Sequence, residues 1–432
     1  MTVEIRPLGV ACNIGCEYCY QEPMRDAGNV ASRYDVDKML AAAGRAGSAF
    51  SLFGGEPLLV PKPDLERIWR FGLERFGSNG IQTNGTLIDD EHIELFRRYH
   101  VHVGISIDGP GELNDVRSAR SGDIMETRRL TERTMAAIAR LVRSRITPSL
   151  IVTLHRGNAI NERLPKLIQW LCDMDDLGIQ GGRLHVLESE TPLIRSIWGL
   201  TSKEYLAAFD AIRQAAKLFR SFKIDVFEEL RPLVLGDDSR VSCVWAACDP
   251  YTTRAVQGIE GSGRLSNCGR TNKDGVDYVK ASSQGFERYV SLYSTPQEQG
   301  GCAGCRFFMF CKGQCPGTAI DGDWRNKTEH CELWMTMLGQ IESELLQEGK
   351  LPLSAHPDRK LIEQKLLEHW ARGENLGLVG AIKEITKERQ MGNDRARQGK
   401  AQRASGAECR PHHGDAGHGD HYDEANPYHQ DR

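Results

Sequence analysis

Three cysteines near the start of the chain, Cys12, Cys16 and Cys19, have side chains and a spacing suited to binding a metal. Their pattern is Cys-x3-Cys-x2-Cys. Four thiolates would close a zinc site or an iron–sulfur cube, whereas three leave one corner of the metal open to another ligand. A structural zinc site and a few isolated buried thiols are the simpler alternatives. The pattern predicts a metal centre with an open position.

The other cysteines are clustered as well. Of the 13 cysteines in the chain, eight lie between Cys243 and Cys331. Without a recognisable export signal, the chain is expected in a reducing cytosol, where thiols bind metals and rarely form disulfides. We therefore expect a cytoplasmic protein with metal centres in both regions.

The segments that must position the first three cysteines alternate between strand and helix patterns. Helix-period stretches at 35–44, 64–76, 89–99, 127–142 and 162–172 separate short β-branched runs. This alternation predicts a parallel α/β sheet, either open or curled into a partial barrel. The expected strands are residues 3–8, 49–53, 80–83, 101–107, 149–154 and 183–187.

Segments with chemical potential follow the first four expected strands. In parallel sheets, ligand-binding loops lie at the C-terminal ends of the strands. The three cysteines follow the first strand, and the Phe-Gly-Gly-Glu-Pro run at 53–57 follows the second. Its glycines let a ligand approach the backbone closely, and its carboxylate could bind an ammonium group. Residues 82–86 and 106–110 follow the third and fourth, although Asn-Gly and Asp-Gly-Pro also occur in plain turns.

The cysteine triad and these loops together resemble the radical SAM superfamily, which cleaves S-adenosylmethionine (SAM) at a [4Fe-4S] cluster with an open iron. The resemblance implies a partial (β/α)6 TIM-type barrel and a cluster held by the triad. It places Tyr18 near the adenine and Glu56 at the methionine amino group. The SAM-binding residues that it implies are Tyr18, Gly54, Gly55, Glu56, Asn84, Ser106, Asp108 and Arg117.

Other polar residues near the expected strand ends have weaker assignments. Arg117 could equally form a surface ion pair. His155, Arg183, His185 and Glu188 could point into the barrel. We expect the two histidines to be structural rather than catalytic.

The later cysteines follow the order Cys302-x2-Cys305-x5-Cys311-x3-Cys315, with Cys331 after them. A zinc ribbon would use the Cys-x2-Cys pair but leave three cysteines to a second site. With Cys248 and Cys268, the order resembles the SPASM extension of radical SAM enzymes, which holds two auxiliary [4Fe-4S] clusters. The resemblance assigns Cys302, Cys305, Cys311 and Cys331 to the outer cluster and Cys248, Cys268 and Cys315 to the inner one, with Cys243 nominated as its fourth ligand.

Composition shifts along the chain suggest five segments. We expect a radical SAM partial barrel at 1–195, a helical bridge at 196–240, a small Cys-rich α+β SPASM domain at 241–335, C-terminal helices at 336–390 and a disordered His-rich tail at 391–432. The later helices are expected at 205–222, 333–348 and 359–388. Metal capture is the alternative role for the tail. Cys172 is expected in the core, and Cys409 has no assigned role.

The activity that the resemblance implies is peptide maturation. A 5′-deoxyadenosyl radical would abstract hydrogen from a ribosomally made precursor peptide, and a cross-link or another oxidative modification would follow. Anaerobic sulfatase-maturase-like oxidation of Ser or Cys to formylglycine and small-molecule dehydrogenation are alternatives. A non-catalytic iron–sulfur electron carrier is the alternative from a different class, but it would not need the SAM loops.

The expected partners are a peptide or protein substrate and an electron donor such as flavodoxin or ferredoxin. Because Cys12 lies close to the start of the chain, a separate leader-binding protein or the C-terminal helices would recognise a leader peptide. The net charge of -4 comes from interspersed charges of both signs, and the sequence lacks an apolar run of about 18 residues. Neither nucleic acid nor a membrane is expected as a partner.

Overall fold

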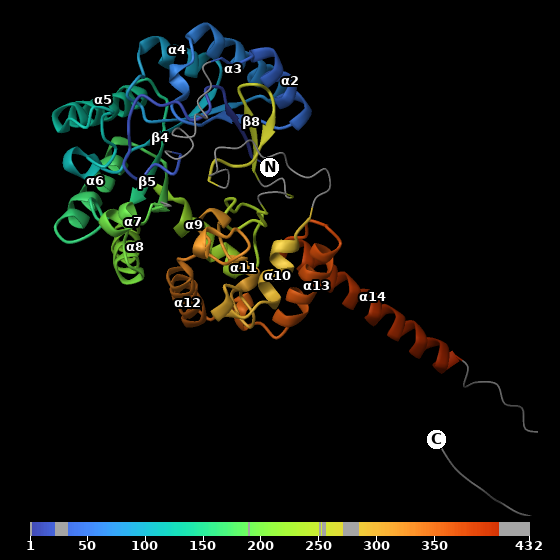
Figure 1. The fold of residues 1–432 in the computed structure, drawn as a ribbon. Coiled ribbons are helices and arrows are strands. Elements are labelled where there is room, and N and C mark those ends of the chain that lie inside the picture. The colour runs from blue at the N-terminus through green and yellow to red at the C-terminus, as the bar shows by residue number, and fades with distance from the viewer. Residues whose placement is uncertain are drawn as a thin grey trace, which may run out of the picture. The chain divides into compact units, whose positions relative to one another are not determined.

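The computed structural model describes residues 2–21, 33–188, 191–249, 252, 256–270 and 285–405. Within these residues, a nine-stranded sheet has the order β7-β6-β5-β4-β3-β2-β1-β8-β9 (Figure 1). Every neighbouring pair is parallel except β8 with β9. The strands are β1 (Thr2–Arg6), β2 (Phe50–Leu52), β3 (Asn79–Thr83), β4 (Val101–Ser106), β5 (Ser149–Leu154), β6 (Gly181–Val186), β7 (Lys223–Ile224), β8 (Val256–Glu260) and β9 (Leu265–Ser266).

The six strands expected from the sequence are confirmed as β1 to β6, in the order of the chain. Both faces of β1 are buried, as is usual for a parallel sheet covered on both sides. Val3 and Ile5 on one face are fully buried, and Glu4 and Arg6 on the other are also buried. Since successive side chains of a strand point to opposite faces, this sheet has a polar buried face beside an apolar one.

Strands β7, β8 and β9 were not expected from the sequence. Val256–Glu260 pairs in parallel with β1, so residues from the Cys-rich region extend the sheet. Arg6 at the end of β1 donates to Glu260 at the end of β8 and also to Ser266 Oγ at 2.5 Å. This buried ion pair joins two neighbouring strands that are far apart in the sequence, and local periodicity does not predict it.

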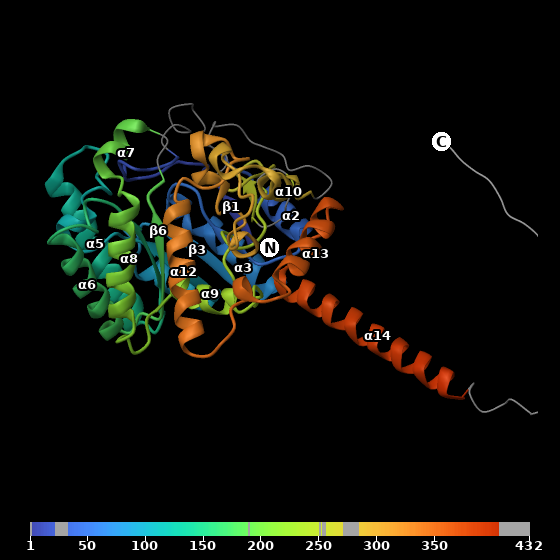
Figure 2. The same ribbon diagram turned by 90° about the horizontal axis from the view of Figure 1, so that it is seen from below.

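Helices cover the outside of the strands, as Figure 2 shows for α3, α5, α6 and α8. Asp35 begins α2 by accepting from the Lys38 backbone N–H, and Asp89 caps α4 in the same way through His92. The helices are α2 (Val36–Ala46), α3 (Lys62–Phe76), α4 (Asp90–Arg98), α5 (Ile124–Arg143), α6 (Arg163–Leu177), α7 (Pro192–Trp198), α8 (Ser202–Ala216), α9 (Asp225–Val234), α10 (Glu287–Ser294), α11 (Phe308–Cys311), α12 (Cys331–Gln347), α13 (Arg359–Ala371) and α14 (Leu378–Ser405).

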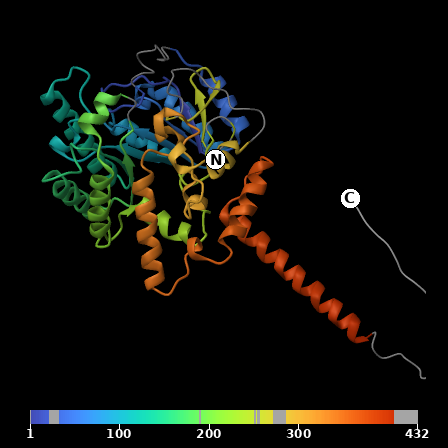
Figure 3. The same ribbon diagram turned by 60° about the horizontal axis from the view of Figure 1, so that its bottom comes forward.

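Helices α8 and α12 lie side by side, which ties the Cys-rich region to the barrel (Figures 2 and 3). Arg213 of α8 donates from both terminal nitrogens to the carboxylate of Glu344 on α12.

The prediction of a helix over 205–222 was wrong at its end. Helix α8 stops at Ala216, because Phe222 and Ile224 are buried at β7 beside β6.

The C-terminal helices also differ from expectation. The predicted helix over 359–388 is two helices, α13 and α14, because Gly373 adopts a positive φ of 74°. Helix α14 continues to Ser405, so residues 391–405 are helical rather than disordered. The histidines of the tail and Cys409 lie outside the described residues.

Residues Met1–Ile382 form one compact unit, and Lys383–Arg432 form a second. The five-segment division of the chain remains a prediction. In the described ranges, none of the helices is both long and apolar enough for a membrane span.

Candidate functional site

An open cavity lies at the C-terminal ends of the strands, and its empty space of about 950 Å³ includes the solvent at its mouth. The three cysteine thiols of the first loop line it, together with residues from β2 to β6 and one residue, Arg270, from the Cys-rich region. Its lining comprises Cys12, Ile14, Cys16, Tyr18, Cys19, Tyr20, Gln21, Phe53, Gly54, Gly55, Gln82, Thr83, Asn84, Ser106, Arg117, Ile151, Thr153, His185, Val186, Glu188 and Arg270.

The cysteine loop is held against the segment that follows β4. Ile14 forms an antiparallel bridge with Ala119, and Gly15 N–H donates to the Ser118 carbonyl at 2.8 Å. Burial raises the pKa of the Cys16 thiol to about 12, although the nearby Arg117 guanidinium lowers it. A thiolate at this position needs a further positive partner, which an iron centre would supply.

The two glycines after β2 allow the second loop to pass very close to the cysteine loop. A Cβ at Gly55 would lie 1.9 Å from the Ala11 carbonyl oxygen. Gly54 has a φ of 115°, and a Cβ there would lie 2.3 Å from the Gly9 carbonyl oxygen. Only glycine fits at either position, so these residues set the width of the cavity beside the thiols.

Glu56 lies behind the cavity wall rather than in it. Its carboxylate accepts from Leu58 N–H, the Thr83 hydroxyl and Asn84 N–H at 2.7–2.9 Å. Asn84, in turn, lines the cavity, with its Nδ2 3.9 Å from the Cys12 sulfur. Glu56 therefore positions the loop after β3. Of Glu56 and Asn84, only Asn84 lines the cavity and can contact a ligand there.

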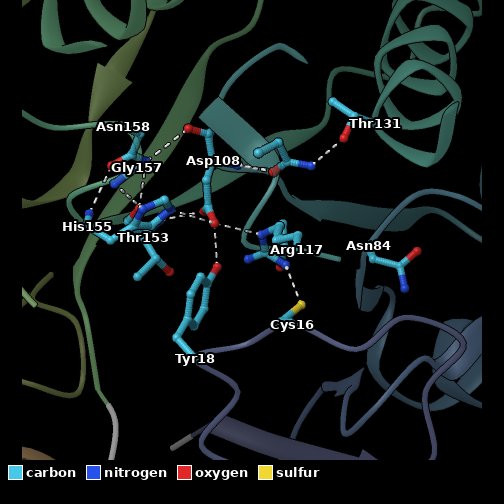
Figure 4. A network of polar contacts seen from close by, with 12 residues as sticks. Cys16, Tyr18, Asn84, Asp108, Arg117, Thr131, Thr153, His155, Gly157 and Asn158 are labelled. Carbon is cyan, nitrogen blue, oxygen red and sulfur yellow. Dashed lines mark hydrogen bonds and ion pairs between the residues drawn. The ribbon is translucent and has the colours of Figure 1, made fainter. Parts of the chain in front are cut away.

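Asp108 is the centre of a buried polar network (Figure 4). It accepts from the Tyr18 hydroxyl at 2.5 Å and from Arg117 Nε at 3.0 Å, while His155 Nε2 lies 3.5 Å away. Burial alone would raise the pKa of Asp108, but Arg117 and His155 hold it below its ordinary value. Asp108 does not line the cavity, so it orients Tyr18 and Arg117, which do.

The side of the cavity built from β6 carries a second polar group. Arg270 donates to Glu188 Oε1 at 2.8 Å and to His185 Nδ1 at 2.7 Å. Burial and the adjacent Arg270 hold the pKa of His185 well below its ordinary value, so its ring is neutral and Nδ1 accepts. Of the strand-end candidates, His185 and Glu188 line the cavity, whereas His155 is buried behind it.

The cysteines of the second region fall into two neighbourhoods. Burial, together with the nearby thiols of Cys305 and Cys331, raises the pKa of Cys302 to about 12. Cys311 lies beside Cys302, Cys305 and Cys331. In the other neighbourhood, burial raises the pKa of Cys268, and the nearby Glu4, Cys243 and Cys315 add to the rise.

Two cysteines need separate comment. The thiol of Cys248 raises the pKa of Tyr289. The expectation that Cys172 lies in the core was wrong, since it is only half-buried on α6. In the described part of the chain, no three His, Cys, Asp or Glu side chains converge as a site for a single metal ion.

Comparison with known proteins finds a similar family for the first part of the chain. Residues 7–171 match the model of the radical SAM superfamily. This segment is a radical SAM domain. The cavity fits the groups that radical SAM proteins bind, SAM and one [4Fe-4S] cluster: three buried or half-buried thiols face an open space bordered by close-packed glycines.

Several relatives of this chain are sulfatase-maturating enzymes. A serine-type enzyme from Bacteroides thetaiotaomicron is 34% identical over 26% of the chain, and the match covers 30% of that enzyme. A cysteine-type enzyme from Clostridium perfringens is 24% identical over 73% of the chain and 88% of its own length. The solved structure of native anSMEcpe with bound AdoMet and Cp18Cys peptide has a TM-score of 0.59 at 17% identity, covering 80% of this chain and 98% of that one. The structural likeness establishes the fold.

Sequence reasoning missed Arg270 as a cavity residue. No motif surrounds it, and it reaches the cavity from 82 positions beyond Glu188. Gln21 and Gln82 were also missed, although they follow a motif or lie within one. A signal for Arg270 was its place two residues after Cys268, where a charged side chain next to a buried thiol needs a partner.

Proposed function

We propose that this radical SAM enzyme oxidises a residue of a peptide or protein substrate. The observation that carries the proposal is the cavity itself. The cysteine thiols and the loops after β2, β3 and β4 form one side of it. The polar side chains of His185, Glu188 and Arg270 form the other. A site that only transferred electrons would not need an open cavity next to its cluster.

Cys12, Cys16 and Cys19 would hold the iron–sulfur cluster, and Gly54, Gly55, Asn84, Ser106 and Arg117 would surround SAM. The cluster and SAM, when bound, would supply a radical able to remove a hydrogen atom from a carbon of the substrate. The chain's own residues orient the reactants and exclude water. Tyr18 is fixed through its hydroxyl by Asp108, and Arg117 is held between Asp108 and the Cys16 sulfur.

We also propose two auxiliary clusters that accept the second electron of the oxidation. The grouping of Cys302, Cys305, Cys311 and Cys331 in one neighbourhood and of Cys243, Cys268 and Cys315 in another supports this proposal. Cys248 would be the remaining ligand of the inner cluster. A flavodoxin or ferredoxin would supply the first electron.

Two substrate classes are compatible with the cavity. Cross-linking of a ribosomally made precursor peptide is one, and oxidation of Ser or Cys to formylglycine is the other. The two relatives named above are sulfatase-maturating enzymes, which favours the second class.

The test is anaerobic reconstitution with iron and sulfide, followed by SAM, dithionite and short peptides that contain one Ser or one Cys. We expect 5′-deoxyadenosine and an oxidised peptide. An aldehyde-reactive probe labels formylglycine but not a cross-link, so labelling separates the two substrate classes. A fully loaded protein that forms no 5′-deoxyadenosine with or without peptides would contradict the enzymatic function.

A further inference from the structure

On the β6 side of the cavity, one carboxylate oxygen of Glu188 accepts a hydrogen bond and the other does not. Oε1 of Glu188 accepts from Arg270 Nη1 at 2.8 Å. Oε2 is buried and has no hydrogen-bond partner among the residues that the structure describes. The Glu188 side chain is only 4% exposed, and a carboxylate oxygen buried without a donor costs free energy. A ligand that donates a hydrogen bond to this oxygen would remove that cost.

A buried donor without an acceptor lines the same cavity. Nε2 of Gln21 has no partner in the described ranges, and the residue is 3% exposed. Residues 269–270 link this nitrogen to Glu188. A Cβ built on Gly269 would lie 3.2 Å from Gln21 Nε2, and the next residue is Arg270, which holds Glu188.

The orientation of Glu188 does not depend on a ligand. Arg270 is fixed by two acceptors, Glu188 and the neutral ring of His185. The free oxygen is consequently held in place before a substrate arrives, which reduces the entropy lost on binding.

An acceptor and a donor that are both unpaired in one cavity match the two polar groups of a peptide bond. The peptide N–H needs an acceptor, and its C=O needs a donor. We infer that Glu188 and Gln21 bind the substrate's main chain, with Oε2 of Glu188 accepting a backbone N–H and Nε2 of Gln21 donating to a backbone C=O. This inference rests on the proposed function and assigns residues to peptide recognition in the same cavity.

Recognition through the main chain has a functional consequence. It would fix the reacting residue without contacting its side chain, which stays free to face the thiols and SAM on the other side. It would also tolerate different neighbouring side chains in the substrate, since every peptide bond presents the same two groups.

The experiment compares three substitutions in the reconstituted full-length protein. Glu188→Gln keeps an oxygen for Arg270 but places an NH2 group where the free oxygen stood. Gln21→Leu removes the donor at nearly constant volume. Glu112→Gln is the matched control, because Glu112 forms an exposed ion pair with Lys166. The probes are the Cp18Cys peptide, its serine counterpart and versions of each that are N-methylated at one residue at a time.

For the unmethylated peptide, we expect KM to rise about tenfold in Glu188→Gln and in Gln21→Leu, with a smaller change in kcat, and no change in Glu112→Gln. One N-methylated peptide should raise KM about tenfold with the wild type but cause no further rise with Glu188→Gln. Iron content and the thermal midpoint of each variant check that it is folded.

Three results would overturn the inference. If peptide is modified and both variants keep the wild-type KM, the proposed function stands and the roles of Glu188 and Gln21 fall. If every N-methylated peptide behaves alike with wild type and Glu188→Gln, the bound donor is not a backbone N–H. If the fully loaded wild type forms no 5′-deoxyadenosine and modifies no peptide, the proposed function fails, and this inference fails with it.

Discussion

Arg117 donates from Nε to Oδ2 of Asp108 at 3.0 Å, and this ion pair is almost fully buried. Nη1 of the same arginine lies 3.9 Å from the Cys16 sulfur. One carboxylate thus holds the cation that faces the middle cysteine of the triad. Because Asp108 also accepts from Tyr18 and from the Thr153 backbone N–H, it ties the cysteine loop to the ends of β4 and β5.

Asp108→Asn should impair both stability and SAM cleavage. The substitution leaves the buried Arg117 cation without its carboxylate, which costs about 3–5 kcal/mol in the free energy of unfolding. Misplacement of Arg117 and Tyr18 should lower the rate of 5′-deoxyadenosine formation about 100-fold. Thermal unfolding and product quantification by chromatography measure the two effects.

The control for this prediction is Asp115→Asn. Asp115 forms an ion pair with Arg128 at the surface, with the arginine side chain 47% exposed. We expect both the thermal midpoint and the rate to stay at wild-type values, since exposed ion pairs contribute little. Equal loss of activity in the two variants would argue against a special role for Asp108.

Cys16→Ala should abolish SAM cleavage while leaving auxiliary iron in place. A cluster with two protein thiolates is lost or inactive, but the cysteines between Cys243 and Cys331 are unaffected. Iron analysis should show a loss of about one third, the share of one [4Fe-4S] cluster among three. Cys172→Ala, on α6, should retain all iron and full activity. Loss of all iron in Cys16→Ala would show that the sites are not separate.

Gly55→Ala should prevent assembly of the site. Its Cβ would lie 1.9 Å from the Ala11 carbonyl oxygen, so the loop after β2 and the cysteine loop must move apart. We expect overpacking to cost about 1–3 kcal/mol in the free energy of unfolding and SAM binding to be lost. Equilibrium dialysis with labelled SAM measures the binding.

Gly44→Ala is the matched control for Gly55→Ala. A Cβ at Gly44 would make an ordinary contact, 3.7 Å from the Phe71 ring, within helix α2. Since alanine favours helix more than glycine does, stability should stay constant or rise by up to about 1 kcal/mol. Unimpaired SAM binding by Gly55→Ala would show that the close approach of the two loops is not required.

The carboxylate of Asp175 should stabilise the fold independently of pH near neutrality. Burial alone would raise its pKa, but backbone N–H groups of Arg220, Ser221 and Phe222 donate to it and lower the pKa to about 2. A lowered pKa in the folded state means that this stabilisation is present above the ordinary pKa near 3.8 and is lost as the pH falls toward 2.

Asp175→Asn tests this arrangement. We expect the free energy of unfolding to fall by about 1–3 kcal/mol, because one amide oxygen cannot accept all three backbone donors. The loss should be the same at pH 8 and pH 6, measured as the shift of the thermal midpoint against wild type. A shift that shrinks markedly by pH 6 would contradict the lowered pKa.

Local patterns along the chain were sufficient for much of the fold and part of the site. The spacing of Cys12, Cys16 and Cys19 and the order of the loops after the first strands are properties of short segments. Strands β1 to β6 were predictable because alternating or continuous β-branched runs report burial directly. Strand β8 was not, since its five residues gain their stability from pairing with β1, about 250 positions away in the chain.

Which carboxylates reach the cavity was decided only by the tertiary structure. From the sequence, Glu56 and Asp108 are the ligand-binding acids, yet both carboxylates accept hydrogen bonds from the protein and neither lines the cavity. Arg270, from the Cys-rich region, holds Glu188 at the cavity and donates to only one of its carboxylate oxygens. The sequence by itself determined the chemistry of Cys12, Cys16 and Cys19, because the residue type and its spacing are properties of one short segment. The partners of each buried charge depend on contacts between distant segments, and these exist only in the folded chain.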